Sequence, residues 1–169
     1  MSNNLVADNF LAFAAKRMKL SQREISRCVE RLSEEQMWHR GGDYENSVAN
    51  LLLHLEGNIR QWILHGIDNQ PDVRERDDEF TLARPVDAAE ARRRFDATVD
   101  EAVGVIAAVD PERLLTVIDP QPTGTWRHAT ILEAIFKVVG HLEMHTGQII
   151  LLTKQLVAGD LDLTMPRKR

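Results

Sequence analysis

Apolar side chains recur along this chain at steps of three and four residues, which is the spacing of one face of an α-helix. Four stretches carry this pattern, at about residues 5–32, 46–66, 87–109 and 129–157. No stretch of comparable length alternates between apolar and polar positions, as a half-buried strand does. The sequence therefore predicts an all-α fold built from four long helices.

Each predicted helix has a candidate buried stripe. In the first helix the stripe consists of Phe10, Phe13, Arg17, Leu20, Glu24 and Cys28. In the second it consists of Leu51, Leu55, Asn58 and Trp62. Arg17 and Glu24 are charged, and an unpaired charge on a buried face is costly. We therefore expect these two side chains either to form an internal ion pair or to lie at the exposed edge of the stripe.

The connections on either side of the third helix are long. Residues 68–86 and 110–128 both exceed the roughly 2–8 residues that usually join two helices. A long connection lets the chain return to the same end of a bundle and begin a parallel neighbour. These segments are either surface loops or, in one case, the cover of a pocket. Asn46 or Ser47 is the expected cap of the second helix, and Asp87 that of the third.

Composition limits the possible partners and locations. The chain has 169 residues, which suits a single domain over 1–169, and its net charge is −5, from 21 basic and 26 acidic residues. A net-acidic chain is a poor candidate for binding nucleic acid, and the basic tail Arg167-Lys168-Arg169 is too short to change this. No run approaches the roughly 18 apolar residues that cross a membrane. With a single cysteine and no secretion signal, we expect a cytoplasmic protein.

Three histidines are the main candidates for chemistry. His141 and His145 lie four residues apart, so they share one face of the fourth helix and their imidazoles can converge on one ion. Imidazole nitrogen suits zinc, nickel, copper or iron(II). A pair does not complete a tight site, and His54, in the apolar second helix, is the candidate third ligand. The spacing leaves open a second interpretation, in which all three are core histidines bonded to neighbouring side chains.

The remaining histidines do not fit this group. His65 lies eleven residues after His54, about 16 Å further along the helix, which is too far to bind the same ion. His39 and His128 fall near helix ends or in loops. We interpret all three as surface or capping residues.

The pattern argues against two metal chemistries. A zincin hydrolase has a glutamate directly after the first histidine as its general base, and here that position is Leu142. Glu143 points about 200° away from His141 around the helix. Di-iron bundles need Glu-x-x-His pairs, and neither Glu133 nor Glu143 has that spacing. The sequence favours a mononuclear site whose open positions can hold water or a thiol.

Polar residues beside the histidines are candidates to orient ligands or substrate. Asn50 and Asn58 flank His54 by one turn on each side, and Gln148 lies one turn after the HxxxH pair. Cys28 lies in the middle of a helix with no histidine at a helical neighbour position. We therefore do not expect it to be a catalytic thiol.

Two segments resemble a known superfamily. The residues NSVANLLLHL at 46–55 and HLEMHTGQII at 141–150 resemble the second and fourth helices of the DinB/YfiT-like superfamily of metalloenzymes. The stretch RERDDEF at 74–80 is similar to a connecting loop in an uncharacterised subgroup. Helix order and helix length agree with this superfamily over essentially the whole chain.

This resemblance implies a four-helix bundle with up-down-down-up connectivity and a long crossover between the second and third helices. It implies that His54, His141 and His145 bind a divalent metal, usually nickel or zinc, and that the protein is a homodimer. Characterised members include S-transferases and isomerases that use low-molecular-weight thiols such as mycothiol, bacillithiol or glutathione. The name DinB refers to induction by DNA damage and not to binding of DNA.

We therefore expect a metal-dependent, thiol-using S-transferase that acts on small electrophiles. Asn58, Gln148 or Arg76 would orient the small-molecule substrate. Two alternatives remain open. One is a metal-dependent hydrolase, for which the sequence indicates no secure general base. The other is a non-enzymatic, dimeric metal- or ligand-binding bundle of the stress response. Neither nucleic acid nor a membrane is an expected partner.

Overall fold

The computed structural model describes residues 4–81, 85–118 and 128–163. The long helices of these residues are α1 (Leu5–Val29), α3 (Val48–Ile59), α4 (Ala88–Ala108) and α5 (Ile131–Val157). Shorter elements are α2 (Glu34–Met37), the π-helix η1 (Arg60–His65), η2 (Arg76–Phe80) and η3 (Pro111–Arg113). Within the described ranges, the extended pairing is one isolated bridge, between Val117 and Thr130. The predicted all-α class is confirmed for this part of the chain. The basic tail and the middle of the 110–128 connection lie outside it.

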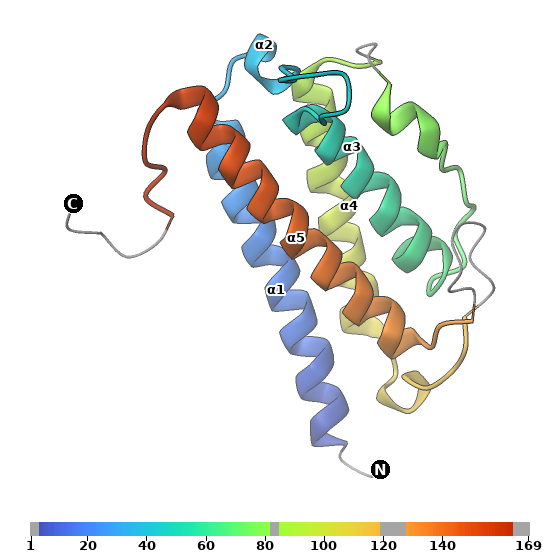
Figure 1. Ribbon diagram of the computed structural model, residues 1–169. Coiled ribbons are helices and arrows are strands. Elements are labelled where there is room, and N and C mark those ends of the chain that lie inside the picture. Colours follow the sequence, from blue (N-terminus) through green and yellow to red (C-terminus); the bar gives the residue numbers. More distant parts are fainter. Residues whose placement is uncertain (1–3, 82–84, 119–127, 164–169) are drawn as a thin grey trace.

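The four long helices lie side by side around a shared apolar core (Figure 1). α1 packs against α4 and α5, and α3 packs against the same two helices. Leu52, Leu55, Phe95, Ile106 and Ile135 are fully buried between them. Full burial of such a side chain contributes about 1.5–3 kcal/mol. Among the described helices, none combines the length and the apolarity that crossing a bilayer requires.

Side-chain caps determine where the helices begin. Ser47, one of the two expected caps, accepts a hydrogen bond from the backbone N–H of Asn50 and starts α3. Asp87 caps α4 as predicted, and Thr130 caps α5. Each cap satisfies a backbone donor that the first helical turn leaves free. The second predicted helix is continuous to Gly66, but its last turn is the π-helix η1.

The buried face of α1 differs from the predicted stripe. The apolar residues that are buried on α1 are Ala7, Leu11, Ala14, Met18, Ile25, Cys28 and Val29. Of the predicted set only Cys28 is buried, and Phe13 is 58% exposed. Both sets obey the same spacing, because apolar residues cover a wide arc of this helix. Contact with two helices selects the arc that carries the small alanines. Arg17 is left at the edge, where it pairs with Glu143 of α5 at 2.5 Å.

The long connection between η1 and α4 is fastened over α3. Its short helix η2 packs against α3. The Asn50 amide donates to the backbone oxygen of Glu79 at 2.9 Å. Arg40 donates to Asn50 Oδ1 at 2.7 Å and to the backbone oxygen of Thr81 at 2.6 Å. These bonds hold the connection beside the α3–α5 face, where the three histidines lie.

Candidate metal centre

Three histidines from two helices meet between α3 and α5. His54 comes from α3, and His141 and His145 come from successive turns of α5. One ligand nitrogen from each ring lies within 4.8 Å of the other two, and Nε2 of His54 is 2.9 Å from Nε2 of His141. His54 and His145 are buried, and His141 is half-buried. The fold thus brings together the three predicted ligands as a group that could hold a metal ion.

Two of the three rings are held through their Nδ1 atoms. His54 Nδ1–H donates to Glu79 Oε2 at 2.8 Å, and His145 Nδ1–H donates to Gln148 Oε1 at 2.6 Å. Because carboxylate and amide oxygens only accept, the proton of each neutral ring lies on Nδ1. Nε2 then presents a lone pair. Metal-binding histidines commonly have such a partner on the opposite nitrogen, which orients the ring.

The Nε2 atom of His145 provides the test of whether a metal fits here. It is buried and has no hydrogen-bond partner among the described residues. A buried polar atom without a partner costs about 1–3 kcal/mol. His54 and His141 can avoid this cost, because Nε2–H of His141 can donate to Nε2 of His54. A metal ion shared by three imidazoles would give His145 a partner as well, so the donor set fits a transition metal.

Local charge and burial keep the rings of His141 and His145 neutral. Burial, together with the neighbouring His145 and His54, lowers the pKa of His141 to about 3. Burial also lowers the pKa of His145, while the hydrogen bond to Gln148 opposes that shift. A metal binds only the deprotonated ring nitrogen. His141 and His145 can therefore bind a metal at neutral pH without first releasing protons.

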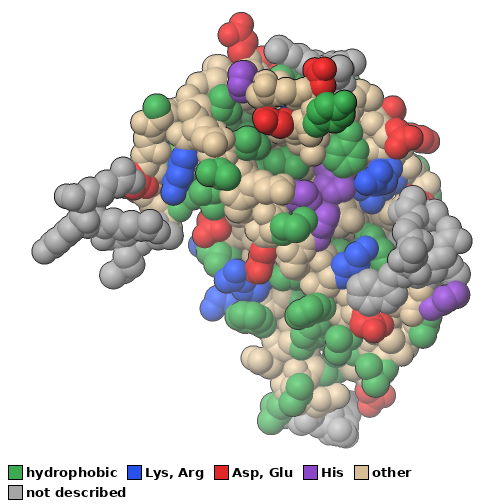
Figure 2. Space-filling model, viewed as in Figure 1, with side chains coloured by type: hydrophobic (Ala, Val, Ile, Leu, Met, Phe, Trp, Pro, Cys, Tyr) green, Lys and Arg blue, Asp and Glu red, His purple; other side chains and the backbone are tan. Residues whose placement is uncertain are grey.

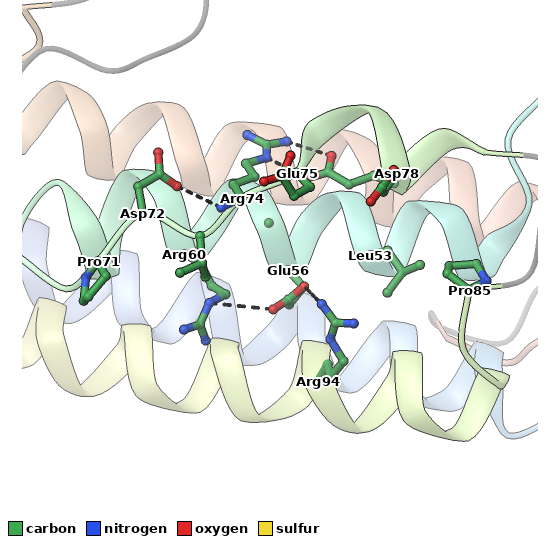
Figure 3. Close-up of a pocket in the computed structure, with 13 residues that line it drawn as sticks. Leu53, Glu56, Arg60, Pro71, Asp72, Arg74, Glu75, Asp78, Pro85 and Arg94 are labelled. Carbon is green, nitrogen blue, oxygen red and sulfur yellow. Dashed lines mark hydrogen bonds and ion pairs between the residues drawn. The ribbon is translucent and has the colours of Figure 1, made fainter.

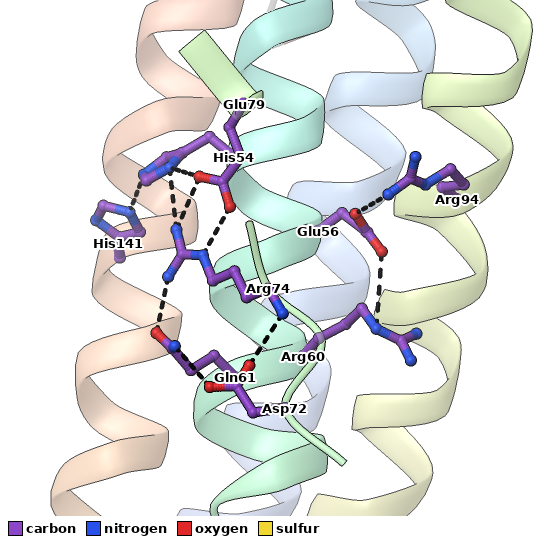
Figure 4. Close-up of polar contacts among 9 residues, drawn as sticks. All are labelled: His54, Glu56, Arg60, Gln61, Asp72, Arg74, Glu79, Arg94 and His141. Carbon is purple, nitrogen blue, oxygen red and sulfur yellow. Dashed lines mark hydrogen bonds and ion pairs between the residues drawn. The ribbon is translucent and has the colours of Figure 1, made fainter. Parts of the chain in front are cut away.

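Glu79 is held by Arg74 as well as by His54 (Figure 4). Arg74 Nε donates to Glu79 Oε1 at 2.6 Å, and Nη2 donates to Oε2 at 2.9 Å. Burial by itself would raise the pKa of Glu79, but the hydrogen bonds from Arg74 and His54 keep it below its usual range. Arg74 also donates to Gln61, and Gln61 donates to Asp72, both at 3.0 Å. An ionised Glu79 therefore fixes the orientation of His54.

Gly57 allows this carboxylate to approach α3. A Cβ at position 57 would overlap Oε1 of Glu79 and would come within 3.0 Å of Nε of Arg74. A larger residue would therefore displace the carboxylate end of Glu79. The absence of a side chain at Gly57 leaves room for the Arg74–Glu79 pair beside α3.

A cavity of about 650 Å³ opens beside His54 and His141. Two rows of side chains form its floor. One row comes from α3 and η1 and consists of His54, Asn58 and Trp62, and the other comes from α5 and consists of Lys137 and His141. Residues 74–78 of the long connection line the opposite side. Figure 2 shows histidine side chains near the centre of one face, with Lys and Arg side chains beside them. The histidine group thus borders a space that a small molecule can enter, and the long connection helps to enclose it.

A second cavity, of about 290 Å³, lies behind the Arg74–Glu79 pair (Figure 3). Its walls come from α3, α4 and the long connection. Glu56 lies 2.8 Å from Arg94 and 3.8 Å from Arg60, so its charge is already paired. Because its described lining contains no histidine, we assign it no part in the metal site.

The predicted substrate-orienting residues occupy different positions. Asn58 lines the cavity beside the histidines, and Arg76 lies at its exposed rim. Gln148 instead accepts the hydrogen bond from His145. Asn50 completes the cap of α3 and binds the backbone of the long connection, so its role is structural. Of these four predicted residues, only Asn58 and Arg76 are therefore placed to touch a ligand in the cavity.

The other candidate groups lie away from this cavity. His65 contacts the backbone oxygen of Gln70 at 2.7 Å, and His128 is exposed. Glu143 is paired with Arg17 and does not line the cavity, in agreement with its predicted direction. Cys28 is buried, and burial raises the pKa of its thiol, which is the environment of an unreactive cysteine.

Sequence reasoning missed Arg74, Glu79, Trp62 and Lys137 as parts of the site. Charged residues crowd the 74–80 stretch, and no local pattern indicates which of them turns inward. The position of Lys137 could have been predicted from the sequence. Lys137 precedes His141 by four residues and therefore shares its helical face.

Comparison with known proteins identifies a family without a described activity. No curated protein matches the chain. A family model described as "Protein of unknown function (DUF1572)" matches residues 5–169, which is nearly the whole sequence. The chain therefore belongs to the DUF1572 family.

Proposed function

We propose that this protein is a metal-dependent enzyme that uses a low-molecular-weight thiol to modify small electrophiles. One divalent transition metal, nickel or zinc, would be held by His54, His141 and His145. The observation that carries the proposal is the buried, unpartnered Nε2 of His145, which lies beside two further imidazoles. Three core histidines without a metal would leave that atom unsatisfied.

The residues around the histidines suit this role. A divalent metal held by three neutral imidazoles supplies Lewis acidity, which lowers the pKa of a thiol or water at an open coordination position. Glu79 and Gln148 orient two of the rings. The adjoining cavity supports a catalytic role over a closed structural site, because a substrate needs space beside the metal.

A metal-dependent hydrolase is the second candidate. The observation in its favour is that Glu75, Asp77 and Asp78 line the same cavity and offer carboxylates. All three are exposed, whereas the buried carboxylate, Glu79, is already bound to Arg74 and His54. The described lining of the cavity therefore offers no buried carboxylate as a general base, so we favour the thiol reaction.

We propose that the chain is a member of the DinB/YfiT-like superfamily, with an up-down-down-up four-helix bundle and a homodimeric assembly. The contacts of α1 and α3 with both α4 and α5, and the long connection before α4, support this bundle. An apolar groove between α1 and α5, lined by Phe13 and Phe136, supports a second subunit. Sedimentation velocity tests the assembly, and a monomer at micromolar concentration would contradict it.

Elemental analysis of the purified, tag-free protein tests the metal site. We expect about one nickel or zinc ion per chain in the wild type and none in His141→Ala. His128→Ala is the matched control, because this histidine is exposed and its loss should leave the metal content unchanged. Metal that persists in His141→Ala would contradict the three-histidine assignment. No metal in the wild type after reconstitution would favour a non-enzymatic binding role.

The thiol reaction is tested with the metal-loaded protein. Glutathione and chlorodinitrobenzene form a coloured thioether, in which a carbon–sulfur bond forms, chloride leaves and the thiol proton passes to solvent. We expect a metal-dependent rate that His141→Ala abolishes. Mycothiol and bacillithiol are assayed in the same way. Hydrolysis of activated esters at a higher rate than any thiol transfer would favour the hydrolase instead.

A further inference from the structure

The cavity beside the three histidines has a metal end and a cationic end. His54 meets His141 at one end, with their Nε2 atoms 2.9 Å apart. At the other end, Nζ of Lys137 lies 3.5 Å from the centre of the Trp62 ring. Lys137 and His141 are one turn apart on α5, which is about 6 Å along the helix axis. A small molecule in this cavity can therefore contact both ends at once.

Asn58 lies on the floor between these ends and has an unused amide. Its side chain is 7% exposed and lines the cavity. It makes no hydrogen bond to any described residue. An amide offers two donor hydrogens and an acceptor oxygen, and those of Asn58 are open to the cavity rather than enclosed by the protein. Asparagine is also a weak helix former, so α3 gains nothing from it at this position. This side chain therefore indicates a polar ligand in the cavity.

The inner wall of the cavity favours a negative ligand. Arg74 and Glu79 neutralise each other, with side chains only 4% and 7% exposed. Burial and the positive charge of Arg74 lower the pKa of Lys137, so an anion beside this ammonium would be stabilised. The acidic residues of the rim are exposed on the long connection, where water and salt screen them.

We propose that the cavity selects a small molecule with a carboxylate, or a similar anionic group, about one helical turn from the atom that lies at the metal end. Lys137 donates to the anionic group, and the Trp62 ring holds the ammonium in place. Asn58 hydrogen-bonds to the ligand between the two ends. This inference rests on the proposed metal site. It names the substrate class that the proposed function leaves open, which is small carboxylic acids.

Binding of two matched thiols to the cobalt(II)-loaded protein tests this selection. Mercaptopropionate carries a carboxylate and mercaptopropanol a hydroxyl, while their carbon chains have equal length. The sulfur-to-cobalt absorption band reports binding of either thiol and gives a Kd without any catalytic assay. We expect the wild type to bind mercaptopropionate about tenfold more tightly, which is the usual contribution of a hydrogen bond to a charged group. Mercaptoacetate and mercaptobutyrate then define the preferred length.

Variants at Lys137 identify the source of the preference. Lys137→Met keeps the apolar stem over Trp62 but removes the charge, so we expect it to bind both thiols as weakly as mercaptopropanol binds the wild type. Lys137→Arg should retain the preference for the carboxylate. Lys154→Met is the matched control, because it removes a lysine from the same helix away from the cavity. Cobalt content and circular dichroism are measured for each variant.

The outcomes separate this inference from the proposed function. Equal affinity of the wild type for the two thiols would overturn the selection of an anion. A preference that survives in Lys137→Met would overturn the role of that lysine. In both cases, cobalt bound to the protein would still support the metal site. A wild-type chain that takes up no cobalt would overturn the metal site, and this inference with it.

Discussion

Replacing Gly57 with alanine tests whether the Glu79 contact supports the histidine group. At an open helical position, glycine to alanine stabilises a protein by about 1 kcal/mol, because glycine is a poor helix former. Gly57 is different, since the added Cβ would overlap Oε1 of Glu79 and crowd Nε of Arg74. These two side chains hold His54. We therefore expect Gly57→Ala to weaken metal binding while the chain stays folded.

The expected magnitudes follow from the interactions that would be lost. Removing the outer hydrogen-bond partner of a metal-binding histidine lowers metal affinity about 10- to 100-fold. In the metal-free chain, about 1 kcal/mol of helix propensity is gained. Against this gain stands a hydrogen bond to the charged Glu79, which contributes about 1.5–3 kcal/mol. We expect the free energy of unfolding to fall by about 0.5–2 kcal/mol.

Gly104→Ala is the matched control for this prediction. Gly104 lies within α4, and nothing lies within 4 Å of a Cβ built there. Its replacement should stabilise the chain by about 1 kcal/mol and leave metal affinity unchanged. Cobalt affinity is measured by competition with a chelator, and stability by urea unfolding of the metal-free chain. A Gly57→Ala chain that matches Gly104→Ala in both measurements would refute the reasoning about Glu79.

Three further predictions concern groups outside the cavity. Burial raises the pKa of Cys28 above 9.0, so the unfolded chain loses this proton first. Stability should therefore fall as the pH rises above about 9, and Cys28→Ala should reduce that fall in urea titrations; identical pH profiles would contradict the shift. Glu143→Gln breaks the half-exposed pair with Arg17, and we expect the free energy of unfolding to fall by less than about 1 kcal/mol while the metal content stays unchanged. Loss of the metal in this variant would instead place Glu143 in the site. Thr130→Ala removes the cap of α5 and should destabilise the chain by about 1 kcal/mol, and an unchanged Tm would contradict this contribution.

The helices were predictable because periodicity and caps are local properties. The spacing of apolar residues and the Asp87 cap located α4 almost to the residue. The same reasoning failed for the buried face of α1. Two arcs of that helix carry apolar residues, and contact with both α4 and α5 decides which arc is covered. The short helices in the connections have too few residues to show a period.

The histidine group was predictable only in part. The rise and rotation of an α-helix require that His141 and His145 share a face, whatever the rest of the chain does. His54 could be named as a third ligand from its buried position and from the resemblance. Only the packing of α3 against α5 brings it within reach of the other two.

The surroundings of the site depend on contacts between distant segments. Nothing in the order of residues 74–80 indicates that Glu79 turns towards His54 or that Gly57 makes room for it. Those contacts exist because Asn50 and Arg40 fasten the long connection over α3. Local spacing determines which side chains share one helix face, because helix geometry is constant. Which faces meet, and which loop covers them, depends on how the whole chain buries its apolar surface.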